Sequence, residues 1–180
     1  MNDADQMLVK QFLLRIRQEG YSIAPNPPRS LGGINIDIFR GKTKICTFDD
    51  RQLGEGCRLR VRTDDSTREE IKQDYYKIFY AFIHLRDLYS IYEAAAPLQG
   101  FDQSLGYRAI MQHGNCILAV RSNTLGELEF GTFMIDNDRF SSRNTIRDNK
   151  YYDMDAYPLA KLDFVSRSGL LSNDRQPHPR

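Results

Sequence analysis

The sequence has little cysteine, and its three cysteines are far apart. Cys46, Cys57 and Cys116 form no CxxC pair, and their number is odd. Sparse cysteine of this kind is typical of a protein from a reducing compartment. The chain also has no apolar run near the roughly 20 residues that a membrane span needs. Residues 1–5 are acidic where a signal peptide would be basic. We therefore expect a cytoplasmic protein without a membrane partner.

An excess of either charge is missing as well. The chain has 25 Lys and Arg residues against 24 Asp and Glu residues. This balance argues against an acidic mimic of DNA and against a generally basic coat for nucleic acid, so only local charge is informative. With 180 residues, of which 41% are hydrophobic and 11% aromatic, the chain can bury a core without disulfides or metals.

Motifs that carry catalysis or bind metals are also missing. The three histidines are far apart, which excludes the close spacing of zinc ligands. Residues 136–138 begin like a calcium loop, but Ser141 and Arg147 stand where that loop needs Gly and Glu. His113 and Cys116 flank a turn, yet Cys116 begins the apolar run 116–120, and we expect its side chain to point into the core.

No phosphate-binding Gly-rich loop, nucleophile elbow or dinucleotide fingerprint is present in the sequence. We therefore predict a protein that is not an enzyme and that has no cofactor and no metal. One alternative is left open, a metal-dependent activity. The acids dense enough to recruit a divalent ion for it are Asp136, Asp138, Asp153 and Asp155.

Hydrophobic periodicity predicts three helices, over residues 5–19, 66–95 and 156–168. The second has apolar residues at alternating steps of four and three and would be roughly 45 Å long. Phe79 and Ile83 broaden its apolar face beyond the narrow seam of a coiled coil. This favours a helix at the centre of the fold, and hence a monomer; the alternative is a helix that pairs with a second copy in a coiled-coil dimer. In the last helix we expect an N-terminal cap at Asp155, proline in the first turn and a stop at Gly169.

Strands fill the intervals between the helices. A hairpin over residues 34–48 with its turn at 40–42 and a third strand at 57–62 are predicted before the long helix. Residues 25–30 and 136–150 are predicted to be loops. After the long helix we expect strands at 107–112, 116–121 and 128–135.

The prediction is thus an α+β fold in the order α-βββ-α-βββ-α, with two three-stranded antiparallel β units around a long central helix. Residues 1–97 form the first half, residues 98–172 form a second half packed on it, and residues 173–180 form a disordered tail. Whether the two β units form one sheet is left open.

Two local groups of basic residues indicate a contact surface. In the strand 57–62, period-two alternation buries the apolar residues and aligns the arginines on the opposite face, where they suit phosphates or an acidic protein surface. The polar loop 136–150 is longer than structural linkers usually are and carries further basic residues. The predicted partner-binding residues are Arg58, Arg60, Arg62, Arg139, Arg143, Arg147 and Lys150.

The last third of the chain resembles a module in small accessory proteins of phages and conjugative elements of gut Firmicutes. The resemblance covers about residues 107–171. It rests on the segments 116–121 and 128–133, on the aromatic pair 151–152, and on the ending AKLDFVSRSGL at 160–170. In that module a β-hairpin leads to an aromatic pair and a closing helix. The resemblance implies an adaptor of a mobile element, without an assigned active site.

Mobile elements carry many small inhibitors of host defence, including anti-CRISPR proteins. We therefore expect a non-catalytic protein that binds and inhibits a host protein, a CRISPR or restriction nuclease. The alternative is an accessory protein that binds nucleic acid directly through the arginine-striped strand and the basic loop.

Overall fold

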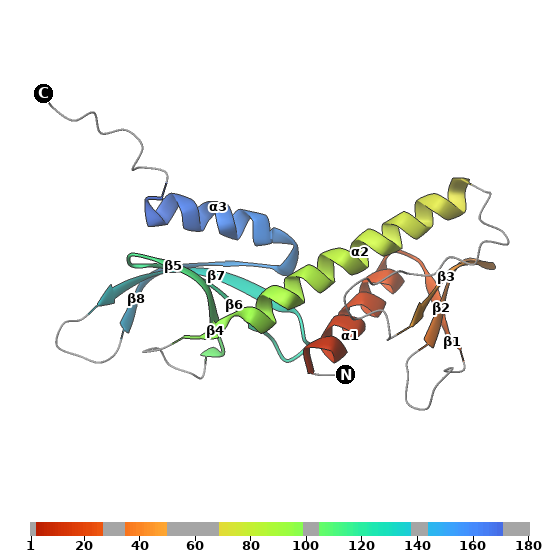
Figure 1. The fold of residues 1–180 in the computed structure, drawn as a ribbon, viewed down its shortest axis with the longest axis horizontal. Coiled ribbons are helices and arrows are strands. Elements are labelled where there is room, and N and C mark those ends of the chain that lie inside the picture. The colour runs from red at the N-terminus through yellow and green to blue at the C-terminus, as the bar shows by residue number, and fades with distance from the viewer. Residues whose placement is uncertain (1–2, 27–34, 50–68, 99–104, 138–143, 171–180) are drawn as a thin grey trace, which may run out of the picture. The chain divides into compact units, whose positions relative to one another are not determined.

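The protein has an α+β fold, seen in a computed structural model that describes residues 3–26, 35–49, 69–98, 105–137 and 144–170. The chain divides into two compact units, Met1–Asp87 and Leu88–Arg180. The division falls inside the longest helix, α2 (Glu69–Ala94), which is labelled in Figure 1. Within the described residues, none of the helices combines the length and the apolar character that a membrane span requires.

The first unit contains α1 and a three-stranded antiparallel sheet in the order β1-β2-β3. Ile38 of the middle strand, β2, pairs with Ile23 of β1 on one side and with Cys46 of β3 on the other. The hairpin between the second and third strands turns at Gly41 and Lys42, as the sequence predicts. The bounds of these elements are α1 Asp3–Gln18, β1 Ser22–Pro25, β2 Asn35–Arg40 and β3 Thr43–Asp49.

Three phenylalanine rings form the centre of the first core. Phe12 of α1, Phe48 of β3 and Phe82 of α2 are all fully buried, and their ring centroids lie 5.2–5.4 Å apart. Helical spacing brings Leu8 and Ile16 of α1 to the same buried side as Phe12. Aromatic rings at such separations attract one another beyond the burial of their area, so this cluster fixes α1, the sheet and α2 together.

A buried carboxylate connects α2 to the sheet. Asp74 accepts hydrogen bonds from the hydroxyl of Tyr21, at 2.9 Å, and from the guanidinium of Arg40. Burial, together with the hydrogen bond to Asp74, raises the pKa of Tyr21 to about 12. A buried acid is tolerated because both donors satisfy it.

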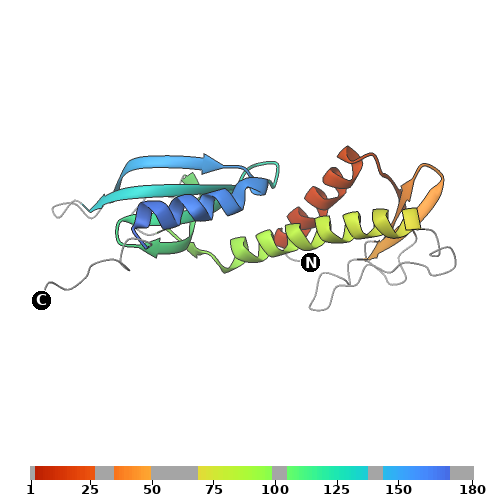
Figure 2. The same cartoon turned by 90° about the horizontal axis from the view of Figure 1, so that it is seen from above.

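The second unit is a five-stranded antiparallel sheet, in the order β4-β5-β6-β7-β8, with helix α3 along one face. Figure 2 shows α3 running over the strands. A single turn of 3₁₀ helix, η3, precedes α3. The bounds are β4 Ala96–Pro97, β5 Arg108–His113, β6 Cys116–Ser122, β7 Leu128–Asn137, β8 Asn144–Tyr152, η3 Met154–Ala156 and α3 Tyr157–Ser168.

Alternation along the strands divides this sheet into two faces. Phe130 faces α3, where its ring centroid lies 4.5 Å from that of Tyr157. On the other face Phe133 packs edge-on against Tyr107, with centroids 5.0 Å apart. Gly131 makes the second contact possible, because a Cβ atom there would lie 2.7 Å from the ring of Phe133. The glycine therefore lets an aromatic ring lie across the strand.

The observed order of strands corrects the sequence prediction. The second unit has five strands instead of three, because β4 precedes the three predicted strands and β8 occupies the second half of the predicted loop 136–150. In the first unit, β1 is a strand that the sequence analysis did not predict. The predicted strand 57–62 and tail 173–180 lie outside the described residues.

The predicted helices are confirmed with small shifts at their ends. The helix predicted over 66–95 spans Glu69–Ala94 within the described residues. The stop at Gly169 is confirmed by its left-handed backbone, with φ of 73°. The cap at Asp155 is wrong, because the N-cap position of α3 is Ala156, which makes no side-chain cap hydrogen bond. Asp153 caps the preceding turn, η3, by accepting a hydrogen bond from the backbone amide of Ala156.

Candidate partner-binding surface

The structure describes two of the seven predicted contact residues. Arg147 and Lys150 both lie in β8, on a regular strand and not in the predicted basic loop, which corrects that prediction. Both side chains are exposed. The remaining five residues lie outside the described part of the chain, so their predicted role stays a prediction; they are Arg58, Arg60, Arg62, Arg139 and Arg143.

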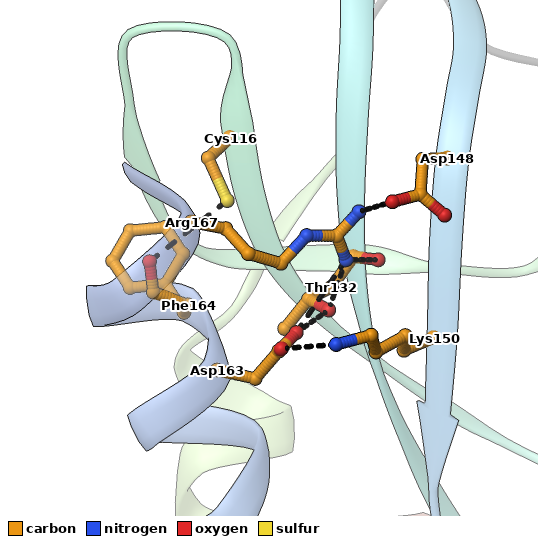
Figure 3. Close-up of polar contacts among 7 residues, drawn as sticks. All are labelled: Cys116, Thr132, Asp148, Lys150, Asp163, Phe164 and Arg167. Carbon is orange, nitrogen blue, oxygen red and sulfur yellow. Dashed lines mark hydrogen bonds and ion pairs between the residues drawn. The ribbon is translucent and has the colours of Figure 1, made fainter. Parts of the chain in front are cut away.

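Lys150 is engaged in a polar network between β8 and α3. Its Nζ atom donates to Oδ1 of Asp163 at 2.7 Å, and the hydroxyl of Thr132 on β7 donates to the other carboxylate oxygen. Figure 3 shows these side chains converging from the helix and the two strands. Lys150 is thus paired with Asp163 while its own side chain stays exposed, and its predicted role in binding a partner stays a prediction.

Arg167 completes the same network from one turn further along α3. Its Nη1 atom donates to the backbone carbonyl of Thr132 at 3.0 Å and lies 3.4 Å from Asp163. Its Nη2 atom donates to the carboxylate of Asp148 on β8 at 2.7 Å. Asp163 and Arg167 thus form an ion pair at a spacing of four residues, which places both side chains on the same face of α3.

The network holds Asp163 in its charged form. Burial raises the pKa of this carboxyl, but hydrogen bonds from Lys150 and Thr132 lower it by more, and the charge of Arg167 acts in the same direction. The net effect is a pKa below the ordinary value of an aspartate. With side-chain exposures of 13% and 11%, Asp163 and Arg167 form a largely desolvated ion pair.

Five residues of the ending 160–170 have a structural role in the second unit. Ala160 and Phe164 are buried against the sheet, and Asp163 and Arg167 anchor the helix to β7 and β8. Gly169 ends the helix. These residues of the motif that carries the resemblance therefore have roles in folding.

Cys116 and His113, at the turn between β5 and β6, both contact backbone carbonyl groups of α3. The thiol of Cys116 is buried and donates to the carbonyl of Phe164 at 4.0 Å, and burial raises its pKa. His113 contacts the carbonyl of Ser168 at 3.1 Å. The prediction that Cys116 points into the core is confirmed. The described residues contain no group of three or more His, Cys, Asp or Glu side chains placed to hold a metal ion.

A cluster of aromatic rings on α2, two of them exposed and two half-buried, is the strongest candidate for a contact surface. Tyr75, Tyr76, Phe79 and Tyr80 are neighbours at helical spacing, and we call them the aromatic ridge. Tyr75 stacks on Phe79 with centroids 6.0 Å apart, and Tyr76 stacks on Tyr80 at 6.2 Å. Edge-on contacts at 5.7 Å join the two stacks. The four rings therefore form one continuous surface.

The ridge lies on the side of α2 that does not face the core of its unit. Ile78, Phe82 and Leu85 are fully buried, whereas 53% of Tyr76 and 64% of Tyr80 are exposed. One side of α2 therefore packs into the core of its unit, as expected for the long helix predicted from the sequence. The opposite side presents rings to solvent where an amphipathic helix usually carries polar residues.

Lysines flank the aromatic ridge on its exposed side. Lys72 and Lys77 are both exposed, and Lys72 lies 3.6 Å from Glu69 in a loose ion pair. Lys77 makes no ion pair with any other residue that the structure describes. A large apolar surface rimmed by charged groups is the arrangement found at protein–protein contacts.

Sequence reasoning missed the ridge. The apolar stripe of steps of four and three includes Tyr75, and Phe79 was expected to broaden the buried face. Tyr76 and Tyr80 were not assigned to either face. The signal that was present is the density of rings, four in six residues, which exceeds what one buried face of a helix can hold.

Comparison of the chain with models of known protein families, with curated proteins and with solved structures gives no significant match.

Proposed function

We propose that this chain is a non-catalytic protein that binds another protein through the aromatic ridge of α2. The observation that supports the proposal is the exposure of Tyr76 and Tyr80 in a continuous cluster of four rings. Tyrosine is enriched at protein interfaces because it brings a large apolar area with few rotatable bonds and a hydroxyl for the wet rim. Such rings are the residue type that dominates binding energy when a partner covers them.

The partner that we propose is a host defence nuclease, a CRISPR or a restriction enzyme. This part of the proposal is supported by the resemblance of residues 107–171 to a module from mobile elements. An inhibitor of this kind acts by covering the surface through which the nuclease binds nucleic acid or becomes activated. It needs no active site of its own.

A cleavage assay with purified components tests the proposal. The chain is added to CRISPR and restriction nucleases from gut Firmicutes, and the concentration that halves cleavage is measured. The double variant Tyr76→Ser/Tyr80→Ser should need at least about tenfold more protein, because each buried interface ring contributes about 1 kcal/mol or more. Leu162→Ser on α3, where the leucine is 67% exposed, is the matched control and should inhibit like the wild type.

Two results contradict the proposal. One is complete cleavage at large molar excess of the wild type with every nuclease tested. The other is an equal loss of inhibition in the ridge variant and in the Leu162→Ser control, which would remove the ridge from the contact. Far-UV circular dichroism checks that all variants are folded, as expected for substitutions of exposed side chains.

Direct binding of nucleic acid is the second candidate function. It is supported by Arg147, whose exposed side chain makes no ion pair with another described residue. Binding through arginines should weaken steeply as salt increases, because condensed counterions are released. A labelled duplex or single strand that does not shift at low salt, or an unchanged affinity after Arg60→Glu and Arg147→Glu, contradicts this candidate.

A further inference from the structure

A basic side chain and an acidic side chain lie at opposite ends of the aromatic ridge, each beside a neighbour of opposite charge. Lys72 lies one turn before the rings, and Asp87 lies about two turns after them. Both side chains are exposed, and their present partners are neighbours on the same helix. Lys72 lies 3.6 Å from Glu69, and Asp87 accepts from Arg86 at 3.2 Å. Exposed pairs of this kind are worth little and exchange readily for a better partner.

Two pairs of side chains are placed symmetrically about the midpoint between Phe79 and Tyr80. Lys72 and Asp87 are equally far from this midpoint along the chain, and so are Tyr76 and Ile83. When two such helices lie antiparallel with their midpoints aligned, Lys72 of one meets Asp87 of the other. Tyr76 of one then meets the half-buried Ile83 of the other. A parallel pair would instead bring like charges together.

The spacing of the ridge suits a helix as its occupant. Tyr76, Tyr80 and Ile83 follow one another by steps of four and three, which is the repeat that packs against a second helix at a shallow angle. A flat surface or a single strand would not follow this line of side chains. A second copy of α2 supplies both the apolar line and the complementary charges.

We propose that two copies of this chain pair antiparallel through the aromatic ridge and that this pairing covers the ridge until a partner protein displaces it. That a partner protein displaces the second copy rests on the function proposed above. The pair has twofold symmetry, so the contact between Lys72 and Asp87 occurs twice. The pairing uses the exposed side of α2 and differs from the buried stripe, which belongs to the core of its own unit.

We expect the pairing to be weak because the contact area is small. One face of one helix buries less area than the roughly 1,200–2,000 Å² of a stable interface. We expect a dissociation constant on the order of 10 µM, so that dilution exposes the ridge. Mass action then regulates the site, because free ridges are scarce at high protein concentration and abundant at low concentration.

Sedimentation velocity of the full chain, from about 1 µM to about 200 µM, tests the proposal. The wild type should move from monomer to dimer over this range. Lys72→Glu and Asp87→Lys should each weaken the dimer about tenfold, because each creates two like-charge contacts in the place of two ion pairs. The double variant Lys72→Glu/Asp87→Lys should restore the wild-type dimer. Lys42→Glu, in the exposed turn between β2 and β3, is the matched control and should leave the dimer unchanged.

Three results overturn the proposal. They are a wild type that stays monomeric throughout, a dimer that neither single charge reversal weakens, and a double variant that fails to recover. The nuclease assay separates this inference from the proposed function, because Lys72→Glu keeps all four rings. Loss of the dimer with full inhibition supports both ideas, whereas a charge-dependent dimer without any inhibition supports the pairing and contradicts the nuclease as partner.

Discussion

Removal of the carboxylate of Asp163 should destabilise the second unit in a pH-dependent way. Asp163→Ala breaks the hydrogen bonds from Lys150 and Thr132 and the contact with Arg167. Complete isolation of a buried charge costs about 3–5 kcal/mol. Arg167 still donates to Asp148 and to the carbonyl of Thr132, so its charge is not isolated. We therefore expect a loss of about 2 kcal/mol in the free energy of unfolding.

The effect of pH follows from the lowered pKa of Asp163. A carboxyl whose pKa is lower in the folded state stabilises the fold fully above its unfolded pKa, about 3.9. That stabilisation disappears as pH falls through the folded pKa. The difference between wild type and Asp163→Ala should thus be largest near pH 7 and should shrink below about pH 4.

Urea unfolding followed by circular dichroism measures both effects. At neutral pH the Asp163→Ala variant should lose about 4–8 °C in melting temperature as well, on the scale of a chain of this length. Asp136→Asn, an exposed acid on β7, is the matched control and should change stability by less than about 0.5 kcal/mol. A loss below about 0.5 kcal/mol for Asp163→Ala, or an equal loss at pH 7 and in acid, would refute this account of the network.

Three further predictions concern the cores. Phe82→Ala should cost about 3–5 kcal/mol in urea unfolding, because it removes one ring of the buried trio, whereas Tyr80→Ala on the exposed side of the same helix should cost far less. Gly131→Ala should cost about 1–3 kcal/mol by pushing a Cβ atom into a neighbouring ring, and an unchanged melting temperature would contradict that crowding. Burial raises the pKa of Cys46 to about 12 and raises that of Cys116, so after replacement of the remaining cysteine by serine the native protein should not react with a thiol reagent at pH 8 until it is unfolded.

Helices of this chain could be predicted from the sequence because local spacing determines them. The stripe through Ile78, Phe82 and Leu85 is buried as its period requires. The close of α3 at Gly169 follows from the need for a left-handed residue after the last turn. In both cases the deciding interactions lie within a few residues of one another.

Strand β8 could not be predicted in the same way. Its sequence, Asn144–Tyr152, is polar on both faces and shows no alternation of apolar residues. What holds it is non-local, since it pairs with β7 and its Asp148 and Lys150 bind Arg167 and Asp163 of the following helix. A search for periodicity cannot detect a strand that is held in place by charged side chains of a later helix.

The short strands were missed for another reason. β1 ends at Pro25 and β4 consists of Ala96 and Pro97, and in a sequence both prolines indicate loops. Both strands lie at the end of the strand order in their sheets, where a missing backbone donor is tolerated. The contact surface was predicted from charge, and the aromatic ridge was overlooked because Tyr76 and Tyr80 lie outside the apolar stripe of steps of four and three.

The position of the unit boundary inside α2 has a thermodynamic consequence. Asp74, near the start of this helix, binds Tyr21 and Arg40 of the first unit, and near its end the hydroxyl of Tyr89 donates to the carbonyl of Gly126 in the second. Unwinding that starts in one unit therefore removes backbone hydrogen bonds that the other unit also uses. The two units should lose their structure cooperatively, and a cut inside α2 should lower the stability of both.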